Sequence, residues 1–219
     1  MSPRRPDPGK RPALIDVAAR LLAEEGPQSL STRRIAAEAG SSTMAVYTHF
    51  GGMSGLVREI VHEGFERLQG FLTRVRQTDD PVADIALLGR AYRHASLVNA
   101  HLYAVMFGGT SLAGFSLTEE DRQYGRYAMV DVVDCAGRCI AAGRFTDGDA
   151  ALIANQMWIA THGLVTLEIG QYLVDPFGAD RCFEAQLVAL LIGAGDAAER
   201  AARSVAASAE RFDAEVRDA

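Results

Sequence analysis

Apolar residues recur at intervals of three and four over most of this chain, which is the spacing that gives a helix one buried face. The first run lies between Pro12 and Glu25, with a proline in its first turn and Gly26 as its stop signal. Further helical patterns occupy residues 53–76, 82–99, 101–107, 119–142, 149–173 and 178–208. Because no segment alternates polar and apolar residues between turn signals, as a half-buried strand would, the predicted fold class is all-α.

Two short apolar runs separated by Gly40 lie between the first helix and the run at 53–76. Ser31 precedes one run and Ser42 the other, and each hydroxyl can accept a hydrogen bond from the free amides of a helix's first turn. Gly40 can adopt the left-handed conformation that ends a helix. The residues expected to face inward are Ile35, Ala36 and Ala39 in the first run, and Val46 and Phe50 in the second, which begins at Thr43. Two short helices joined by a glycine turn predict a helix-turn-helix between Ser31 and Phe50.

The composition is that of a folded protein. With 219 residues, 48% of them hydrophobic, the chain can bury a full core. No apolar run reaches the roughly 18 residues of a membrane span, and no apolar segment follows the charged first ten residues as in a signal peptide, so we expect a cytoplasmic protein. The three cysteines are too few, and odd in number, for a disulfide framework. Cys135 and Cys139 would share a helix face, but no further ligand motif accompanies them, so we expect core packing and no metal.

The charge is unevenly distributed along the chain. The net charge is −6, yet residues 1–60 contain eight Lys or Arg against six Asp or Glu, while the remainder contains 14 against 22. A mildly basic head on an acidic body suits a protein that contacts DNA with one end only. Residues 1–10, with three prolines and three basic side chains, predict a flexible arm, which is either a solvated tail or a minor-groove contact.

Three segments, Leu21–Gly26, Leu30–Gly40 and Val46–Phe50, resemble in nearly unbroken register the N-terminal domain of the tetracycline-repressor family of transcriptional regulators. Asn99–Phe107, with Ala100 in place of a proline, and Trp158 with His162-Gly163 resemble the C-terminal subgroup named for tryptophan, histidine and glycine. The resemblance implies a homodimer that binds double-stranded operator DNA and needs no cofactor. It divides the chain into an arm (1–10), a DNA-binding domain (11–52), a connecting helix (53–78) and a ligand-binding and dimerisation domain (79–219).

The second helix of a helix-turn-helix enters the major groove with its N-terminal end, so only its first exposed side chains reach base edges. Those side chains are Thr43, Met44, Tyr47 and Thr48. The residues expected near phosphates are Ser31, Thr32, Arg33, Tyr47 and His49, and Ser42 is expected to cap the second helix of the motif. Core packing is the competing interpretation of Tyr47, but Val46 and Phe50 already supply an inward face.

Two positions depart from the family pattern. Met53 stands where a phosphate-binding lysine is usual, so one charge contact is missing and we expect a shallower salt dependence of DNA binding. Ser41 replaces the usual apolar turn residue, which would loosen the packing between the two short helices.

Segments 149–173 and 178–208 are rich in Ala, Leu, Ile and Gly, so they suit an antiparallel four-helix dimer interface, or else packing within one monomer. The middle helices carry more aromatic residues than a small bundle needs, which predicts a small-molecule pocket. The predicted lining is Tyr92, Tyr103, Phe107, Tyr124, Trp158 and His162. Segment Gly108–Gly114 is either a flexible entrance or an ordinary connection. We expect repression relieved by a small, mostly apolar effector that changes the separation of the two heads.

Two other function classes compete with a regulator. One is an enzyme that uses His94, His101 or His162 as a base or metal ligand, but the sequence contains no metalloprotease, nucleophile-elbow or phosphate-loop motif. The other is an architectural DNA-binding protein without a ligand, which would protect many unrelated sequences. We therefore expect a regulator and not an enzyme.

Overall fold

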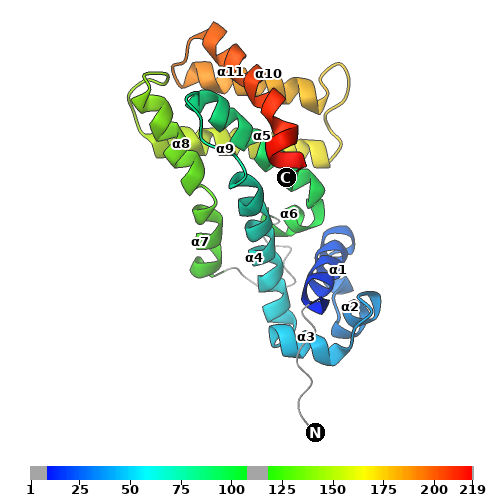
Figure 1. Ribbon diagram of the computed structural model, residues 1–219. Helices are drawn as coiled ribbons and strands as arrows, with labels where there is room; N and C mark the ends of the chain where they lie inside the picture. Colours follow the sequence, from blue (N-terminus) through cyan, green and yellow to red (C-terminus); the bar gives the residue numbers. More distant parts are fainter. Residues whose placement is uncertain (1–8, 108–117, 219) are drawn as a thin grey trace. The chain divides into compact units, whose positions relative to one another are not determined.

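The computed structural model describes residues 9–107 and 118–218, which contain helices and no strand, so the predicted all-α fold is confirmed (Figure 1). Most of the predicted arm and the segment Gly108–Gly114 lie outside the described residues. The helices are α1 (Lys10–Glu25), α2 (Thr32–Glu38), α3 (Thr43–Phe50), α4 (Met53–Leu72), α5 (Pro81–Val98), α6 (Ala100–Phe107), α7 (Glu119–Tyr127), α8 (Val130–Ala141), α9 (Ala150–Ile169), α10 (Ala179–Gly193) and α11 (Ala198–Phe212). A 3-10 turn, Pro27–Ser29, follows α1, and a π-helical turn, Asp213–Arg217, follows α11.

The chain forms two compact units, and the division falls inside α4, between α5 and α6, and inside α7. The head unit comprises Met1–Arg67 and Asn99–Gly125, and the body unit comprises Leu68–Val98 and Arg126–Ala219. No helix in the described part of the chain is long and apolar enough to cross a membrane.

The head unit is built around α1, whose buried face packs against α2, α3 and α6. The buried residues of this face are Leu14, Ile15, Ala18, Ala19, Leu21 and Leu22. Gly64 lets α4 approach α6 closely, because a Cβ at this position would lie 2.3 Å from the Sδ of Met106. Ion pairs from Arg11 to Glu59 and from Arg67 to Asp16 (2.9 Å) also join α1 to the head part of α4.

The body unit is built around α5, in which 13 of 18 residues are buried. Such a helix must be covered on all sides, and α8, α9, α10 and α11 pack around it. Gly89 provides room for α10, because a Cβ there would lie only 3.3 Å from Leu187.

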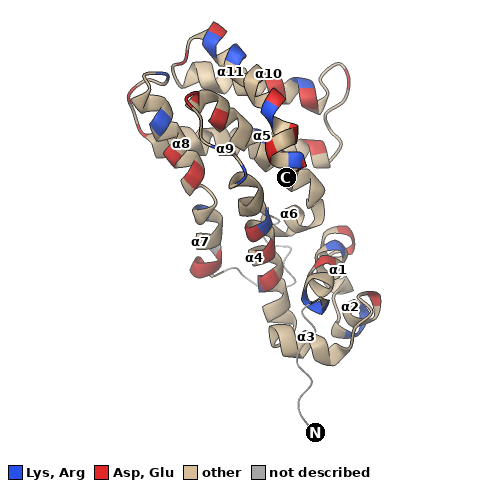
Figure 2. Ribbon diagram, in the orientation of Figure 1, with Lys and Arg blue, Asp and Glu red and all other residues tan. Residues whose placement is uncertain are grey.

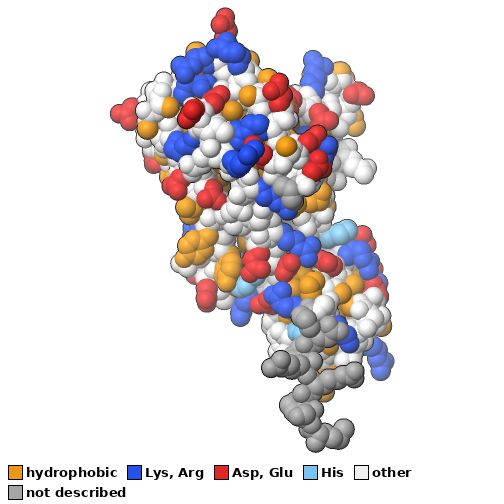
Figure 3. Space-filling view, in the orientation of Figure 1, with side chains coloured by type: hydrophobic (Ala, Val, Ile, Leu, Met, Phe, Trp, Pro, Cys, Tyr) orange, Lys and Arg blue, Asp and Glu red, His pale blue; other side chains and the backbone are white. Residues whose placement is uncertain are grey.

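The buried carboxylate of Asp84 joins α8 and α11 to α5. Asp84 accepts from Arg138 at 3.0 Å and from Arg211 at 2.7 Å. Arg211 also donates to Glu215, and this hydrogen bond lowers the pKa of Glu215 to about 2. On the face of the body unit drawn in Figure 3, acidic and basic side chains intermingle.

Four predicted helix bounds are wrong, and one of them is that of 149–173, whose helix ends at Ile169. The helix expected over 53–76 ends at Leu72, the segment 119–142 breaks between α7 and α8, and 178–208 breaks between α10 and α11. The last break needs Gly195, which has φ +115° and whose added Cβ would lie 2.2 Å from the Oγ1 of Thr146. The amide of Thr146 also donates to the carbonyl of Ala194 at 2.9 Å, so a contact from a distant part of the chain fixes this turn.

Candidate nucleic-acid interface

The two short helices begin at the predicted caps. The hydroxyl of Ser31 accepts from the amide of Arg34 at 3.2 Å, and that of Ser42 accepts from the amide of Ala45 at 3.3 Å. Gly40 adopts the predicted left-handed conformation with φ +58°. These local signals set the turn between α2 and α3, because each satisfies backbone groups that the helix ends leave free.

Ser41, which stands where an apolar turn residue was expected, is half-buried. Its amide donates to the carbonyl of Ala36 at 2.7 Å, so the backbone of the turn is satisfied. Its hydroxyl is buried and has no hydrogen-bond partner among the described residues. A buried hydroxyl without a partner costs free energy at this turn. The expected looser packing between the two short helices stays a prediction.

Helix α3 separates inward and outward side chains as its spacing predicts. Val46 and Phe50 are buried, whereas Met44 is 69% exposed and Tyr47 is 56% exposed. Thr43 and Thr48 are also exposed, and Thr48 donates its hydroxyl hydrogen to the carbonyl of Met44 at 2.9 Å. Core packing is therefore not the role of Tyr47. The outward face consists of one thioether, one phenol and two threonines.

The basic residues of the head are mostly held in ion pairs. Arg34 of α2 contacts Glu25 at 2.7 Å and Glu38 at 2.9 Å, and Arg20 contacts Glu38 at 2.5 Å. Hydrogen bonds to these carboxylates raise the pKa of Arg34.

Two basic residues of the head form no ion pair within the described residues of the segment 9–60, and they are Lys10 and Arg33. Arg33 is exposed, as are Ser31 and Ser42, while Thr32 and His49 are half-buried.

No Lys, Arg, Asp or Glu occurs in α3 itself (Figure 2). The turn into α4 is tight, because Gly51 and Gly52 have positive φ and a Cβ at Gly55 would lie 1.8 Å from the carbonyl oxygen of Phe50. Met53 is half-buried at the first position of α4, where it offers no charge. The close approach at Gly55 was not predicted, although a glycine just inside a helix signals such contacts.

Family models match the chain at two places. The model for bacterial regulatory proteins of the tetR family matches residues 14–60, and the model for the tetracyclin repressor-like C-terminal domain matches residues 85–190. The chain belongs to the tetracycline-repressor family. It is therefore a DNA-binding transcriptional regulator, and regulators of this family bind operator DNA and act as dimers.

Solved structures agree with this membership. A protein of unknown function from Rhodococcus sp. RHA1 is 27% identical, covers 90% of this chain and 100% of its own, and has a TM-score of 0.71. A tetR-family regulatory protein from Rhodococcus RHA1 is 20% identical over 87% and 100% of the two chains, with a TM-score of 0.69. The TetR-family regulator PfmR from Thermus thermophilus is 21% identical over 82% and 97%, with a TM-score of 0.65. The latter two establish the fold alone. No curated protein matches the chain.

The six predicted effector residues of this regulator fall into two groups. Tyr103, Phe107 and Tyr124 belong to the head unit, where the rings of Tyr103 and Phe107 lie 5.0 Å apart and Tyr124 stacks on His62 at 4.1 Å. Tyr92, Trp158 and His162 belong to the body unit.

The three body residues are joined by hydrogen bonds through the phenol of Tyr92. The Nε1 of Trp158 donates to this oxygen at 3.2 Å, and the oxygen lies 3.2 Å from the Nδ1 of His162. Burial lowers the pKa of His162, so its imidazole is neutral near pH 7 and its Nδ1 can accept the phenol hydrogen. The tryptophan and histidine of the subgroup signature therefore tie α9 to α5.

The remaining histidines and cysteines of the regulator have structural contacts. His94 lies edge-on to Phe71 and Phe212, and His101 is 3.7 Å from Glu24. Cys135 donates to the carbonyl of Pro81, and a hydrogen bond with Cys135 together with burial raises the pKa of Cys139. Within residues 9–107 and 118–218 no group of three or more His, Cys, Asp or Glu could hold a metal ion.

Proposed function

We propose that this regulator represses transcription by placing α3 of each subunit in a major groove. Thr43, Met44, Tyr47 and Thr48 read base edges, while Ser31, Thr32, Arg33 and His49 contact phosphates and Ser42 caps the helix. One observation supports this assignment above the others: two large side chains of one short helix, Met44 and Tyr47, are exposed although Val46 and Phe50 complete its inward face. With no charged residue in α3, thymine methyl groups and hydrogen-bonding base edges suit its thioether, phenol and threonines.

A mobility-shift and footprinting experiment on DNA upstream of the regulator's own gene and its neighbours tests this proposal. A symmetric dimer should protect two half-sites whose centres are about 34–36 Å apart, or a multiple of one helical turn. Absence of any shift contradicts operator binding by this chain. Protection of many unrelated sequences instead favours the architectural alternative.

The proposed repressor releases DNA when a small, mostly apolar effector binds against the aromatic side chains of α5 and α9 in the body unit. The hydrogen bonds that join Tyr92, Trp158 and His162 support an apolar ligand. They occupy the phenol oxygen, the indole Nε1 and the imidazole Nδ1, so the ligand would contact mainly the faces of the rings. A compound that binds this site should raise the melting temperature and also weaken operator binding. If stabilising compounds leave operator affinity unchanged, effector release is contradicted.

We place the proposed dimer interface on α9 and α10. On α9, Leu152, Ile159, Gly163 and Leu167 are exposed at steps of seven, four and four residues, which keeps them on one face. On α10, exposed Ala185, Ala189 and Ile192 form a second stripe of small and apolar residues. Helix α11, by contrast, packs against α5 within the body unit. The predicted segment 178–208 therefore contributes only its first part to the proposed interface.

Ile159→Glu should convert the dimer into a monomer at micromolar concentration, because each C2 interface would then bury two carboxylates without partners. Ile159 is 62% exposed, so the substitution costs the isolated chain little stability. Light scattering coupled to size-exclusion chromatography measures the mass. Val130→Glu, at an exposed apolar residue of α8, is the matched control and should remain dimeric. A dimeric Ile159→Glu variant would exclude this interface.

A further inference from the structure

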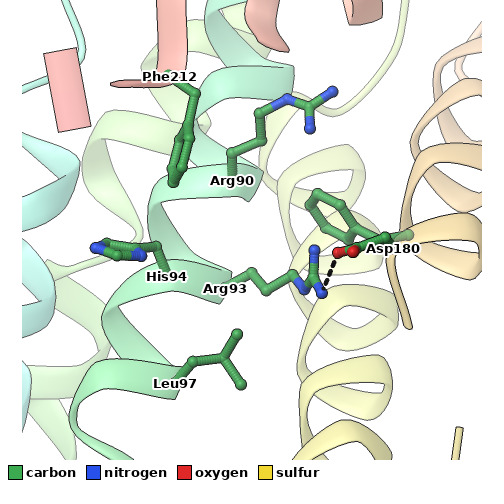
Figure 4. Close-up of a pocket in the computed structure, with 7 residues that line it drawn as sticks. Arg90, Arg93, His94, Leu97, Asp180 and Phe212 are labelled. Atoms are coloured by element: carbon green, nitrogen blue, oxygen red, sulfur yellow. Dashed lines mark ion pairs between the residues drawn. The ribbon is translucent and has the colours of Figure 1, made fainter. Parts of the chain in front are cut away.

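The body unit contains a cavity of about 220 Å³ between α5, α10 and α11 (Figure 4). Its lining has one cationic side and one apolar side, formed by Arg90, Arg93, His94, Leu97, Asp180, Phe183 and Phe212. None of these residues belongs to the proposed DNA or effector contacts. Since a cavity of about 150 Å³ holds a benzene molecule, this one has room for a single ring with a small polar group.

Arg93 has one edge of its guanidinium available for a further ligand. Its Nε and Nη2 donate to Glu168 at 2.7 and 2.6 Å, which occupies one edge. The other edge, Nη1–Nη2, has a single contact of 2.7 Å from Nη2 to Asp180 (Figure 4). No hydrogen bond of Nη1 is recorded in the part of the chain that the structure describes. A carboxylate on this edge would form the paired hydrogen bonds that guanidinium groups favour.

Asp180 is the group that such a carboxylate would displace. Its side chain is 91% exposed at the start of α10, and exposed ion pairs contribute little net stability. The guanidinium of Arg90 is already hydrogen-bonded within the protein. It donates to Glu184 at 2.5 and 2.8 Å, to the hydroxyl of Ser208 at 2.9 Å and to the carbonyl of Val205 at 3.2 Å. Arg93 is therefore the group of this cavity that can receive an anion.

The apolar side of the cavity is held in place by aromatic contacts. The ring of His94 lies between Phe71 and Phe212, edge-on to both at 5.3 and 5.4 Å. Burial, followed by repulsion from Arg217 and Arg74, lowers the pKa of His94, so this wall is uncharged near pH 7. The centroid of the buried ring of Phe183 lies 5.1 Å from the guanidinium carbon of Arg93, which is within the range of a cation–π contact.

We propose that this cavity binds a small monocarboxylate that carries one apolar ring or a short alkyl chain. The carboxylate takes the Nη1–Nη2 edge of Arg93 in place of Asp180, and the apolar part packs against Phe212 and Leu97. This site is separate from the proposed effector contacts, because Tyr92 on the same helix is bonded to Trp158 and His162 of α9, whereas the cavity faces α10 and α11. Its occupation does not depend on whether the chain binds an operator.

Titration calorimetry of the full-length protein with benzoate, phenylacetate and hexanoate, each beside its neutral amide, tests the proposal. At least one acid should bind with a dissociation constant of about 1 mM or tighter, and its amide about tenfold more weakly or not at all. Asp180→Asn should bind the acid about threefold to tenfold more tightly, because a competing negative charge is removed from Arg93. Glu210→Gln, at an exposed acid of α11, is the matched control and should leave the affinity unchanged.

Arg93→Met should abolish the preference for the acid over its amide. Because this variant also leaves Glu168 without its partner, the exposed Asp180→Asn substitution provides the test that does not depend on folding. Equal binding of acids and amides, no binding of any acid, or weaker binding by Asp180→Asn would each overturn the proposal. Tighter binding of benzylamine than of benzoate would show a cation site instead.

Discussion

Tyr47→Ala is expected to weaken operator binding by about 30-fold to 10⁴-fold while the protein remains folded. Loss of one specific contact at a DNA interface costs about 1–3 kcal/mol, and a symmetric dimer loses the contact in both half-sites, so the total is about 2–6 kcal/mol. Tyr47 is on the outward face of α3, so its removal leaves no cavity in the core around Val46 and Phe50. Fluorescence anisotropy with a labelled operator fragment measures the affinity, and a melting curve reports folding.

The matched control for this variant is Tyr127→Ala. Tyr127 is also exposed, at 66%, but it belongs to the body unit and is not one of the proposed DNA contacts, so operator affinity should not change. Tyr47→Phe separates the two contributions of the side chain, because it removes the hydroxyl group and keeps the ring. If Tyr47→Ala binds the operator with unchanged affinity, the proposal that α3 contacts base edges is contradicted, whatever the footprint shows.

The head could be predicted closely because its signals are local. Ser31, Gly40 and Ser42 each act on backbone groups within a few residues, so the caps and the turn follow from the sequence alone. The inward face of α3 follows from the helical period once Val46 and Phe50 are recognised. What the sequence did not reveal is the ion pairing of Arg34 with Glu25, nine residues away, which leaves Arg33 as the exposed cation of α2.

The body was predicted less well because distant contacts determine its turns. Ala194-Gly195 interrupts an otherwise periodic apolar segment, and Thr146, about fifty residues earlier in the chain, contacts this turn. Beyond α4, Arg76 is held by its amide and guanidinium to Glu215, near the other end of the chain. Periodicity within a window of the sequence cannot detect such constraints.

The lining of the cavity between α5, α10 and α11 was not predicted from the sequence, for a related reason. Pocket candidates were chosen from the sequence as aromatic residues, whereas one side of this cavity is formed by arginines. The cavity lies between α5, α10 and α11, and its lining includes two arginines whose free donors depend on which carboxylates contact them. The spacing of residues in the sequence identifies the faces of a helix, but it does not show between which faces a cavity remains.

A second large effect is expected for the buried ion pair between Arg144 and Asp196. Arg144 donates to both carboxylate oxygens of Asp196, at 2.8 and 2.6 Å, and also to Asp80 at 2.8 Å and Ser204 at 3.0 Å. The side chains of Arg144 and Asp196 are both buried. Since removal of one member leaves the other as an uncompensated buried charge, Arg144→Met should lower the free energy of unfolding by about 3–5 kcal/mol.

Urea unfolding followed by tryptophan fluorescence measures this loss in the body unit, because Trp158 is the chain's single tryptophan and lies there. Protein concentration must be held constant, since dimerisation contributes to the apparent stability. Arg203→Met, at an exposed arginine of α11, is the matched control and should change stability by less than about 0.5 kcal/mol. Adding Asp196→Asn to Arg144→Met should recover a large part of the loss, because the carboxylate without a partner is then absent. If the double variant is no more stable than the single one, the packing of the arginine stem and not the buried charge accounts for the effect.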